Sequence, residues 1–214
     1  MKKLLAIACI IATPGLLLSA EKPDGALGTN SISFSAAYAN LDFSHYQSGM
    51  DLDFAGVSLG FNQSISKGQP FSMDMNASFS YMTNQNYSEI ISLDARMTMI
   101  GLTFYREGML SPFFRPVIGY GQLKTDYDNF SEDDDSWLYG GRIGVEIHIK
   151  PGLSMTPYAS YLNASEDALG SNTEIGLNMD FWANERLGII AGVMYSKEYH
   201  VDAFGVSLGA AMHF

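Results

Sequence analysis

FGVSLGAAMHF, residues 204–214, is the stretch that decides the fold. Every second residue in it is apolar, and the residues between are mostly small or polar. The apolar positions are Phe204, Val206, Leu208, Ala210, Met212 and Phe214. A period of two places alternate side chains on opposite faces of a β-strand. The stretch therefore predicts a strand with one apolar face, ending on an aromatic residue.

The first twenty residues, MKKLLAIACIIATPGLLLSA, have the three parts of a secretory signal. A basic start is followed by an apolar stretch and by the small-residue cleavage motif LSA at residues 18–20. We therefore expect residues 1–20 to be a signal peptide and residues 21–214 to form one domain. The only cysteine, Cys9, lies within this signal, so the exported part has no thiol for a disulfide.

The same alternation recurs along the exported part of the chain and predicts an all-β fold with ten strands. These strands are expected at residues 31–43, 51–62, 71–81, 89–105, 113–124, 142–149, 153–162, 174–181, 187–196 and 204–214. The pattern changes phase near Ala55-Gly56, where we expect a β-bulge, and again near Met99. Pro116 removes a ladder donor and indicates that its strand is irregular or begins late. An overcount there or near Leu153 would leave eight strands, which is the alternative.

The connections between the predicted strands alternate in length. The second, fourth, sixth and eighth are short, and three of them contain Gly or Pro turn residues. The others are mostly longer and polar, and the longest is expected at residues 126–136. Bacterial outer-membrane barrels have short turns on one rim and longer loops on the other. An even number of strands then places both termini on the periplasmic side.

The face opposite the apolar residues distinguishes a membrane barrel from a soluble sandwich. In a sandwich the apolar face points inward and the outer face is well charged. Here the other face carries Ser, Gly, Ala and Asn with few charges, which suits the crowded interior of a narrow barrel. Aromatic residues near the ends of the apolar rows resemble interface girdles; they are Phe43, Tyr81, Tyr120, Tyr161, Tyr195 and Phe214. Because a sheet in lipid must close, we predict a closed antiparallel transmembrane β-barrel in the outer membrane.

Two stretches resemble a known group of proteins. YGGRIGVE, residues 139–146, is similar to a strand of the small bacterial outer-membrane barrels, the opacity-protein and OmpA-like β-barrel group. The terminal strand resembles the signal that the outer-membrane assembly machinery reads. This resemblance implies a role in assembly for Leu208, Ala210, Met212 and Phe214. Many members of the group have eight strands, so ten is a departure.

Nine charged residues are expected in the barrel lumen. They are Asp74, Asp94, Arg96, Arg115, Arg142, Glu146, His148, Glu174 and Asp180. Arg115 and Glu146 lie on consecutive strands at similar depth, so we expect them to pair. These charges could line an ion-selective pore. We favour a salt-bridged plug instead, because a narrow barrel is filled largely by its own side chains.

Two polar clusters are expected near the outer rim. Residues 126–135 contain six carboxylates, which could hold calcium or bridge lipopolysaccharide through divalent cations. Their spacing matches no complete calcium loop, so a solvated acidic loop is favoured. The second cluster, Asp51 and Asp53 opposite His200 and Asp202, resembles the rim site of omptin-type proteases, although its His precedes its Asp. Two exposed rim pairs are the favoured interpretation.

The charge balance limits the possible partners. The whole chain has a net charge of −11, and without the two N-terminal lysines it has 10 basic and 23 acidic residues, or −13. Such acidity argues against a nucleic-acid partner. We predict no cofactor and no metal site. The expected protein is a monomeric, non-enzymatic barrel with a structural or surface-interaction role. Its partners would be outer-membrane lipid, lipopolysaccharide and the assembly machinery, and the alternative is a narrow porin-like diffusion channel.

Overall fold

The chain forms ten antiparallel β-strands. The computed structural model describes residues 27–28, 30–42, 51–68, 70–84, 91–127, 130–165, 171–184, 186–198 and 201–214. The strands are β1 (Ser31–Asp42), β2 (Asp51–Ser66), β3 (Ser72–Asn84), β4 (Ile91–Tyr105), β5 (Leu110–Tyr127), β6 (Phe130–Lys150), β7 (Leu153–Ala164), β8 (Ser171–Trp182), β9 (Leu187–Glu198) and β10 (Val201–His213). The described residues include no helix long and apolar enough to span a membrane.

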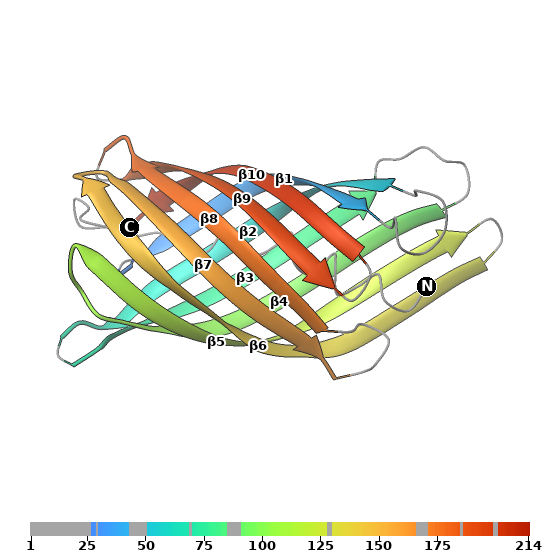
Figure 1. Cartoon of the computed structure of the whole chain (residues 1–214), viewed down its shortest axis with the longest axis horizontal. Coiled ribbons are helices and arrows are strands. Elements are labelled where there is room, and N and C mark those ends of the chain that lie inside the picture. The colour runs from blue at the N-terminus through green and yellow to red at the C-terminus, as the bar shows by residue number, and fades with distance from the viewer. Residues whose placement is uncertain are drawn as a thin grey trace.

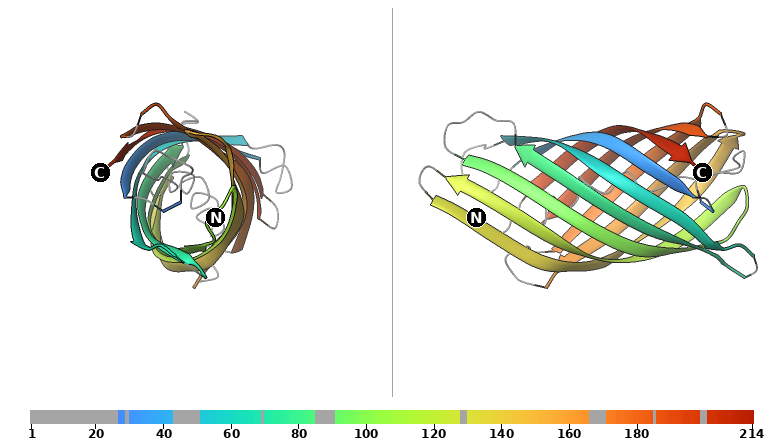
Figure 2. Two further views of the ribbon diagram at one scale, coloured as in Figure 1. Left: turned by 90° about the vertical axis from the view of Figure 1, so that its left-hand side faces the viewer. Right: turned by 180° about the vertical axis from the view of Figure 1, so that it is seen from behind.

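The sheet closes on itself. Each strand pairs with its neighbours in the chain, and β1 also pairs with β10, so the order is a closed barrel. The closing ladder runs from Ser31 opposite His213 to Asp42 opposite Asp202. Figure 1 shows the tilted strands from the side, and Figure 2 (left) shows the closed ring. The prediction of ten strands is confirmed, and the alternative of eight is wrong.

The fifth strand is longer than predicted. It begins at Leu110 rather than late, but its ladder with β4 has a break beside Pro116. The paired residues on either side of the break are Gly101 with Val117 and Phe104 with Phe114. Proline has no N–H to donate, which explains the break. The prediction of an irregular strand is therefore confirmed at this point.

The two rims of the barrel differ. One, here called the short-turn rim, carries the β2–β3, β4–β5, β6–β7 and β8–β9 connections and the end of β10. Gly152, with φ +83°, makes the turn between β6 and β7. At the same rim the N–H of Phe214 donates to the carbonyl of Asn30 at 3.2 Å, and the Phe214 ring stacks on Phe61. The opposite rim is here called the long-loop rim.

In the half of the barrel near the short-turn rim, apolar side chains point outward and polar ones inward. On β1, Ile32 and Phe34 are 45% and 52% exposed on the outer face. Ser31, Ser33 and Ser35 on the same strand are buried in the lumen. This is the arrangement expected for strands that cross lipid.

In the half near the long-loop rim the arrangement is inverted. On β1, Ala39 and Leu41 are fully buried inside, whereas Asn40 faces outward. On β4, Leu93 is fully buried inside, whereas Arg96 is exposed on the outer surface. The same strands therefore have a membrane-type half and a half built like a soluble barrel.

This inversion corrects two predictions. The register of β2 is continuous through Ala55, which faces Thr83, so there is no bulge near Ala55-Gly56. The register of β4 is also continuous through Met99. The apolar residues change face because the strand passes out of lipid, not because the chain slips by one residue. The one shift in the β2–β3 register lies between Ser64 and Ser66.

The third outer connection is a hairpin rather than the long loop predicted at residues 126–136. Strand β5 continues to Tyr127 and β6 begins at Phe130. These two strands have 18 and 21 residues, more than the roughly 9–11 that a tilted strand needs to cross a bilayer. Their paired ends therefore project beyond the membrane-type half.

Candidate functional site: the filled lumen

The structure places seven of the nine predicted lumen charges inside the barrel. They are Asp74, Arg115, Arg142, Glu146, His148, Glu174 and Asp180. The prediction was wrong for Asp94 and Arg96, which lie on the outer surface of β4. The alternation predicts Asp94 and Arg96 in the lumen only if the apolar Leu93, Ala95 and Met97 face lipid. In this half the apolar face is the inner one.

A layer of two arginines crosses the middle of the lumen. Arg115 on β5 lies directly opposite Arg142 on β6, and both are almost fully buried. The Nη2 of Arg142 is 3.3 Å from Oε1 of Glu174 on β8, and its guanidinium lies 4.0 Å from the centre of the Tyr158 ring. The expected pair of Arg115 with Glu146 is wrong: Arg142 pairs with Glu174 instead, and Glu146 lies opposite Ser111.

A chain of hydrogen bonds links Arg115 to the neighbouring strands of the barrel wall. Its Nε donates to the hydroxyl of Thr103 at 2.6 Å. That hydroxyl donates to the amide oxygen of Asn76, whose amide nitrogen donates to Asn62. These four residues come from β5, β4, β3 and β2. The chain therefore joins four adjacent strands by polar contacts inside the lumen.

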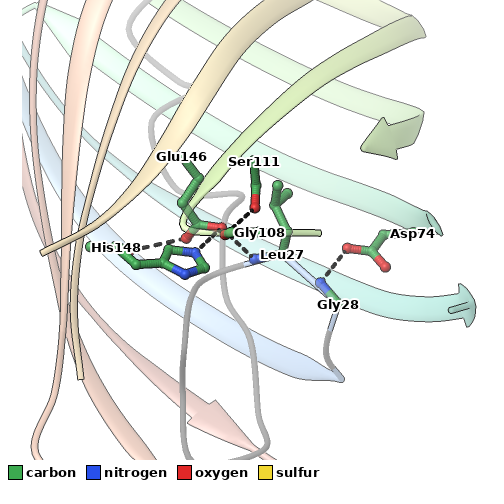
Figure 3. A network of polar contacts seen from close by, with 8 residues as sticks. Leu27, Gly28, Asp74, Gly108, Ser111, Glu146 and His148 are labelled. Carbon is green, nitrogen blue, oxygen red and sulfur yellow. Dashed lines mark hydrogen bonds and ion pairs between the residues drawn. The ribbon is translucent and has the colours of Figure 1, made fainter. Parts of the chain in front are cut away.

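The N-terminal segment enters the short-turn end of the lumen and binds two buried carboxylates. The N–H of Leu27 donates to Oε2 of Glu146 at 3.1 Å, and the N–H of Gly28 donates to Oδ2 of Asp74 at 2.8 Å (Figure 3). Gly28 has φ +96°, and a Cβ there would lie 2.8 Å from the hydroxyl of Tyr105. Glycine is therefore required at this position both by its backbone conformation and by the space available.

Glu146 is the centre of this contact. Its Oε1 accepts a hydrogen bond from the Ser154 hydroxyl at 3.0 Å. Nε2 of His148 lies 3.4 Å from its Oε2, and Figure 3 shows the two side chains together. The side chain of Leu27 packs against the aromatic cluster of Tyr105, Phe113 and Tyr158. Polar and apolar contacts together hold residues 27–28 inside the barrel.

The long-loop half of the lumen is filled by an apolar cluster, here called the long-loop core. Its members are Ala39, Leu41, Leu52, Phe54, Met82, Leu93, Ala95, Met97, Met99, Leu123, Leu138, Leu162, Ala164, Met194, Val201 and Ala203. Phe54, Leu41 and Met82 are at most 1% exposed. Below it, a cavity of about 30 Å³ lies between Met99, Arg115 and Arg142, space for about one water molecule. Among the described residues, the buried charged side chains therefore lie in the short-turn half of the barrel interior.

Tyrosine–aspartate contacts mark the level at which the two halves meet. On the outer face, the hydroxyl of Tyr38 donates to Asp53 at 2.6 Å and that of Tyr81 to Asp94 at 2.9 Å. Tyr120 makes the same contact with Asp135. In each pair the tyrosine is on the strand that runs toward the long-loop rim, and the aspartate is on the next strand, nearer that rim. This placement is typical of amphipathic aromatic rings at a membrane surface.

The remaining predicted girdle residues are Tyr161, Tyr195, Phe214 and Phe43. Tyr161 and Tyr195 are also outward-facing and about half exposed, whereas Phe214 lies at the other rim. The sixth residue of the predicted girdle, Phe43, lies outside the described residues. Outward-facing tyrosines therefore lie near the middle of the strands, and Phe214 lies at the short-turn rim.

The polar clusters at the long-loop rim have structural partners. Asp53, which was considered as part of a protease-like site, accepts hydrogen bonds from both Tyr38 and Asn40. Asp202 lies 4.0 Å from Lys197. His200 lies outside the described residues. Among the described residues no three His, Cys, Asp or Glu side chains are placed to hold a metal ion.

The acidic residues of the β5–β6 hairpin border a surface hollow of about 360 Å³. Asp94, Arg96, Gln122, Lys124, Asp133 and Asp135 line it. Lys124 forms an exposed ion pair with Asp126 at 2.9 Å. The hollow therefore combines carboxylates of residues 126–135 with two cations from outside this range, Arg96 and Lys124.

Comparison with known protein families agrees with this architecture. Residues 10–214 match the family described as the outer membrane protein beta-barrel domain. The chain belongs to this family. The protein is therefore an outer-membrane β-barrel, and the predicted resemblance to small outer-membrane barrels and the predicted location are confirmed. No protein of curated function matches the sequence.

The solved structures that match this chain include Ail, Neisserial surface protein A and the N-terminal barrel of OprF. Ail of Yersinia pestis is 17% identical, with 87% of this chain and 99% of that chain covered and a TM-score of 0.41. Neisserial surface protein A is 12% identical over 86% and 97% of the two chains, with a TM-score of 0.41. The N-terminal barrel of OprF from Pseudomonas aeruginosa is 12% identical over 87% and 99%, with a TM-score of 0.40. At these identities the likeness is one of fold.

Proposed function

We propose that this outer-membrane barrel is a non-conducting, non-enzymatic protein that serves as an envelope scaffold and presents its long-loop half to the exterior. The observation that carries the proposal is the long-loop core. Phe54, Leu93 and Leu123, from three strands, are buried within this one cluster. An ion would have to cross this packed apolar region, where an unpaired charge is strongly unfavourable.

The short-turn half supports the same conclusion. The Arg142–Glu174 pair occupies the middle of the lumen, and Leu27 and Gly28 are held in its mouth by Glu146 and Asp74. An open pore of this family type needs a wet, polar path through the barrel. The described side chains supply a polar path only as far as the arginine layer.

The outer surface of the long-loop half supports a surface role. It is polar, it projects beyond the tyrosine level, and it contains the hollow beside the β5–β6 hairpin. We further propose that lipid and lipopolysaccharide contact the barrel below and at the tyrosine level, that the terminal strand is read by the assembly machinery, and that the protein is a monomer. Supporting this, Leu208, Met212 and Phe214 are 57–63% exposed on the outer face.

Conductance in planar bilayers tests the proposal. The wild-type barrel should give no stable steps in potassium chloride. A variant that replaces the core residues Phe54 and Leu93 with serine should conduct if it still folds, and an Arg96→Ser variant on the outer surface is the matched control. Stable, salt-dependent steps from the wild-type protein would reject the plug and support the narrow diffusion channel.

A further inference from the structure

A group of buried polar side chains in the short-turn half has no partner among the described residues. Both carboxylate oxygens of Asp180 are unpaired, as are both amide atoms of Asn178 and the hydroxyl of Thr156. All three side chains are 0% exposed. By contrast, Glu146, Asp74 and Arg142 in the same half each have a hydrogen-bond or ion-pair partner. Buried polar groups are nearly always paired, so this exception calls for an explanation.

The register brings these groups together on one part of the lumen wall. Thr156 on β7 lies directly opposite Asn178 on β8, and Ser154 lies directly opposite Asp180. Directly opposed residues have Cβ atoms about 4.5–5.5 Å apart. Asn178 and Asp180 are two residues apart on the same strand, so they share the inward face. The three polar side chains therefore border one small region of the lumen.

The charges around this region do not balance. The Ser154 hydroxyl, opposite Asp180, donates to Glu146, so two carboxylates flank the same serine. His148 contacts Glu146, and Arg142 is paired with Glu174. No described cation contacts Asp180. A buried carboxylate without an opposite charge is strongly unfavourable, so the site calls for either a cation or a proton.

We propose that Asp180, Asn178 and Thr156 bind a primary ammonium group. An ammonium group has three N–H donors and no acceptor. The site offers the Asp180 carboxylate, the Asn178 amide oxygen and the Thr156 hydroxyl oxygen as acceptors. The ammonium charge would also compensate the second carboxylate, Glu146. A neutral ligand would leave the charge of Asp180 uncompensated.

The ammonium could come from two sources. Lys22 lies five residues before Leu27, whose N–H is 3.1 Å from Glu146. Five extended residues span up to about 17 Å, so a side chain at this position can reach the wall beside Glu146. Lys22 itself lies outside the described residues. The second source is a free primary amine that enters by the short-turn rim.

Thermal unfolding of the purified, signal-processed protein in detergent tests the site and separates the sources. The variants are Asp180→Asn, Lys22→Met and the double variant, with Lys150→Met at the same rim as control. The ligand probe is methylammonium chloride, compared with tetramethylammonium chloride, which has no N–H, at the same ionic strength. If Lys22 supplies the ammonium, the Asp180→Asn variant, which keeps the side-chain shape, should lower Tm by on the order of 5 °C. If a free amine supplies it, Asp180→Asn should have a lower Tm than the wild type only when methylammonium is present.

Each outcome is decisive. If Lys22 is the source, Lys22→Met lowers Tm by an amount similar to Asp180→Asn, and the double variant is no less stable than either single variant. The Tm changes of Lys150→Met and Asp180→Asn, in contrast, should add when the two changes are combined. If a free amine is the source, methylammonium raises the Tm of the wild type but not of Asp180→Asn, and Lys22→Met has no effect. A wild-type Tm in Asp180→Asn, with no response to methylammonium, would show a neutral carboxyl and overturn the proposal.

Discussion

The half of the barrel near the short-turn rim and the half near the long-loop rim use the same strands but pack in opposite ways. On β1 the inward residues change from Ser33 to Leu41, and the outward residues change from Phe34 to Asp42. The backbone register does not change along the way. Alternation alone therefore does not say which face is the inner one, because the answer depends on what surrounds that part of the strand.

The difference has a simple physical origin. In lipid, apolar side chains gain nothing from being inside, and the lumen can hold polar groups that pair with one another. Above the membrane the exterior is water, so burial of apolar surface in the lumen is favourable by about 25 cal/mol per Å². The tyrosine level, marked by Tyr38, Tyr81 and Tyr120, lies where the apolar side chains change from the outer face of the barrel to its inner face.

The largest expected effect comes from placing a charge in the long-loop core. Leu93→Lys should destabilise the barrel by about 4–5 kcal/mol or more, because Leu93 is fully buried among apolar side chains. Urea unfolding of the refolded barrel measures it. Asp94→Lys, the next residue on the same strand, faces outward and is the control. Equal losses in the two variants would contradict the inverted packing.

Removal of one partner of the buried ion pair should have the next largest effect. Glu174→Gln leaves the Arg142 guanidinium, only 5% exposed, without its carboxylate and should cost about 3–5 kcal/mol. The exposed pair of Lys124 and Asp126 is the comparison, and Lys124→Met should change stability little. If Glu174→Gln and Lys124→Met lower the free energy of unfolding equally, the Arg142–Glu174 pair is solvated by water rather than buried.

A charge on the lipid-facing surface should have an intermediate effect that depends on position. Phe34→Lys, on the outer face of the short-turn half, should cost about 2–4 kcal/mol. Asn40→Lys lies on the same face of the same strand, beyond the tyrosine level, and should be nearly neutral. The free energy of unfolding in lipid vesicles measures both. A neutral Phe34→Lys would place that residue outside the bilayer.

The smallest effect concerns the boundary itself. Tyr81→Phe removes the hydroxyl that donates to Asp94 at 2.9 Å. Because the contact is partly solvated, the loss should be about 0.5 kcal/mol. The Tm of the variant, compared with that of Tyr161→Phe, measures it. A loss of several kcal/mol would mean that the tyrosine–aspartate contacts hold the hairpins together rather than marking the membrane surface.

The barrel could be predicted from the sequence because the features that indicate it are set by residues close together in the chain. The alternation of Phe204 to Phe214 and the short connections depend on neighbouring residues, and both are confirmed. The prediction of residues 1–20 as a signal peptide concerns the part of the chain outside the described residues and stays a prediction. The positions of Asp94 and Arg96 were predicted wrongly, because a period of two does not identify which face is buried.

The contacts inside the lumen could not be read from the sequence. Arg142 meets Glu174 across 32 residues, and Leu27 meets Glu146 across 119. Positions so far apart are brought together only by the register of several strands. The tyrosine–aspartate contacts recur in three hairpins at sequence separations of 15, 13 and 15 residues, but only the strand register shows which tyrosine and aspartate face one another. A search for tyrosines one strand away from outward aspartates would have found them once the register was known.

The amino-acid sequence by itself determined that this is an all-β outer-membrane barrel of ten strands, because strand period, turn residues and the polarity of each face are local properties. Only the tertiary structure decided what fills the barrel. Closure of β1 on β10 sets which side chains share the lumen and at what depth. It placed the apolar core, the Arg142–Glu174 pair and the unpaired Asp180 in one interior. Burial and pairing are properties of that enclosed space, so they exist only when the ring is closed.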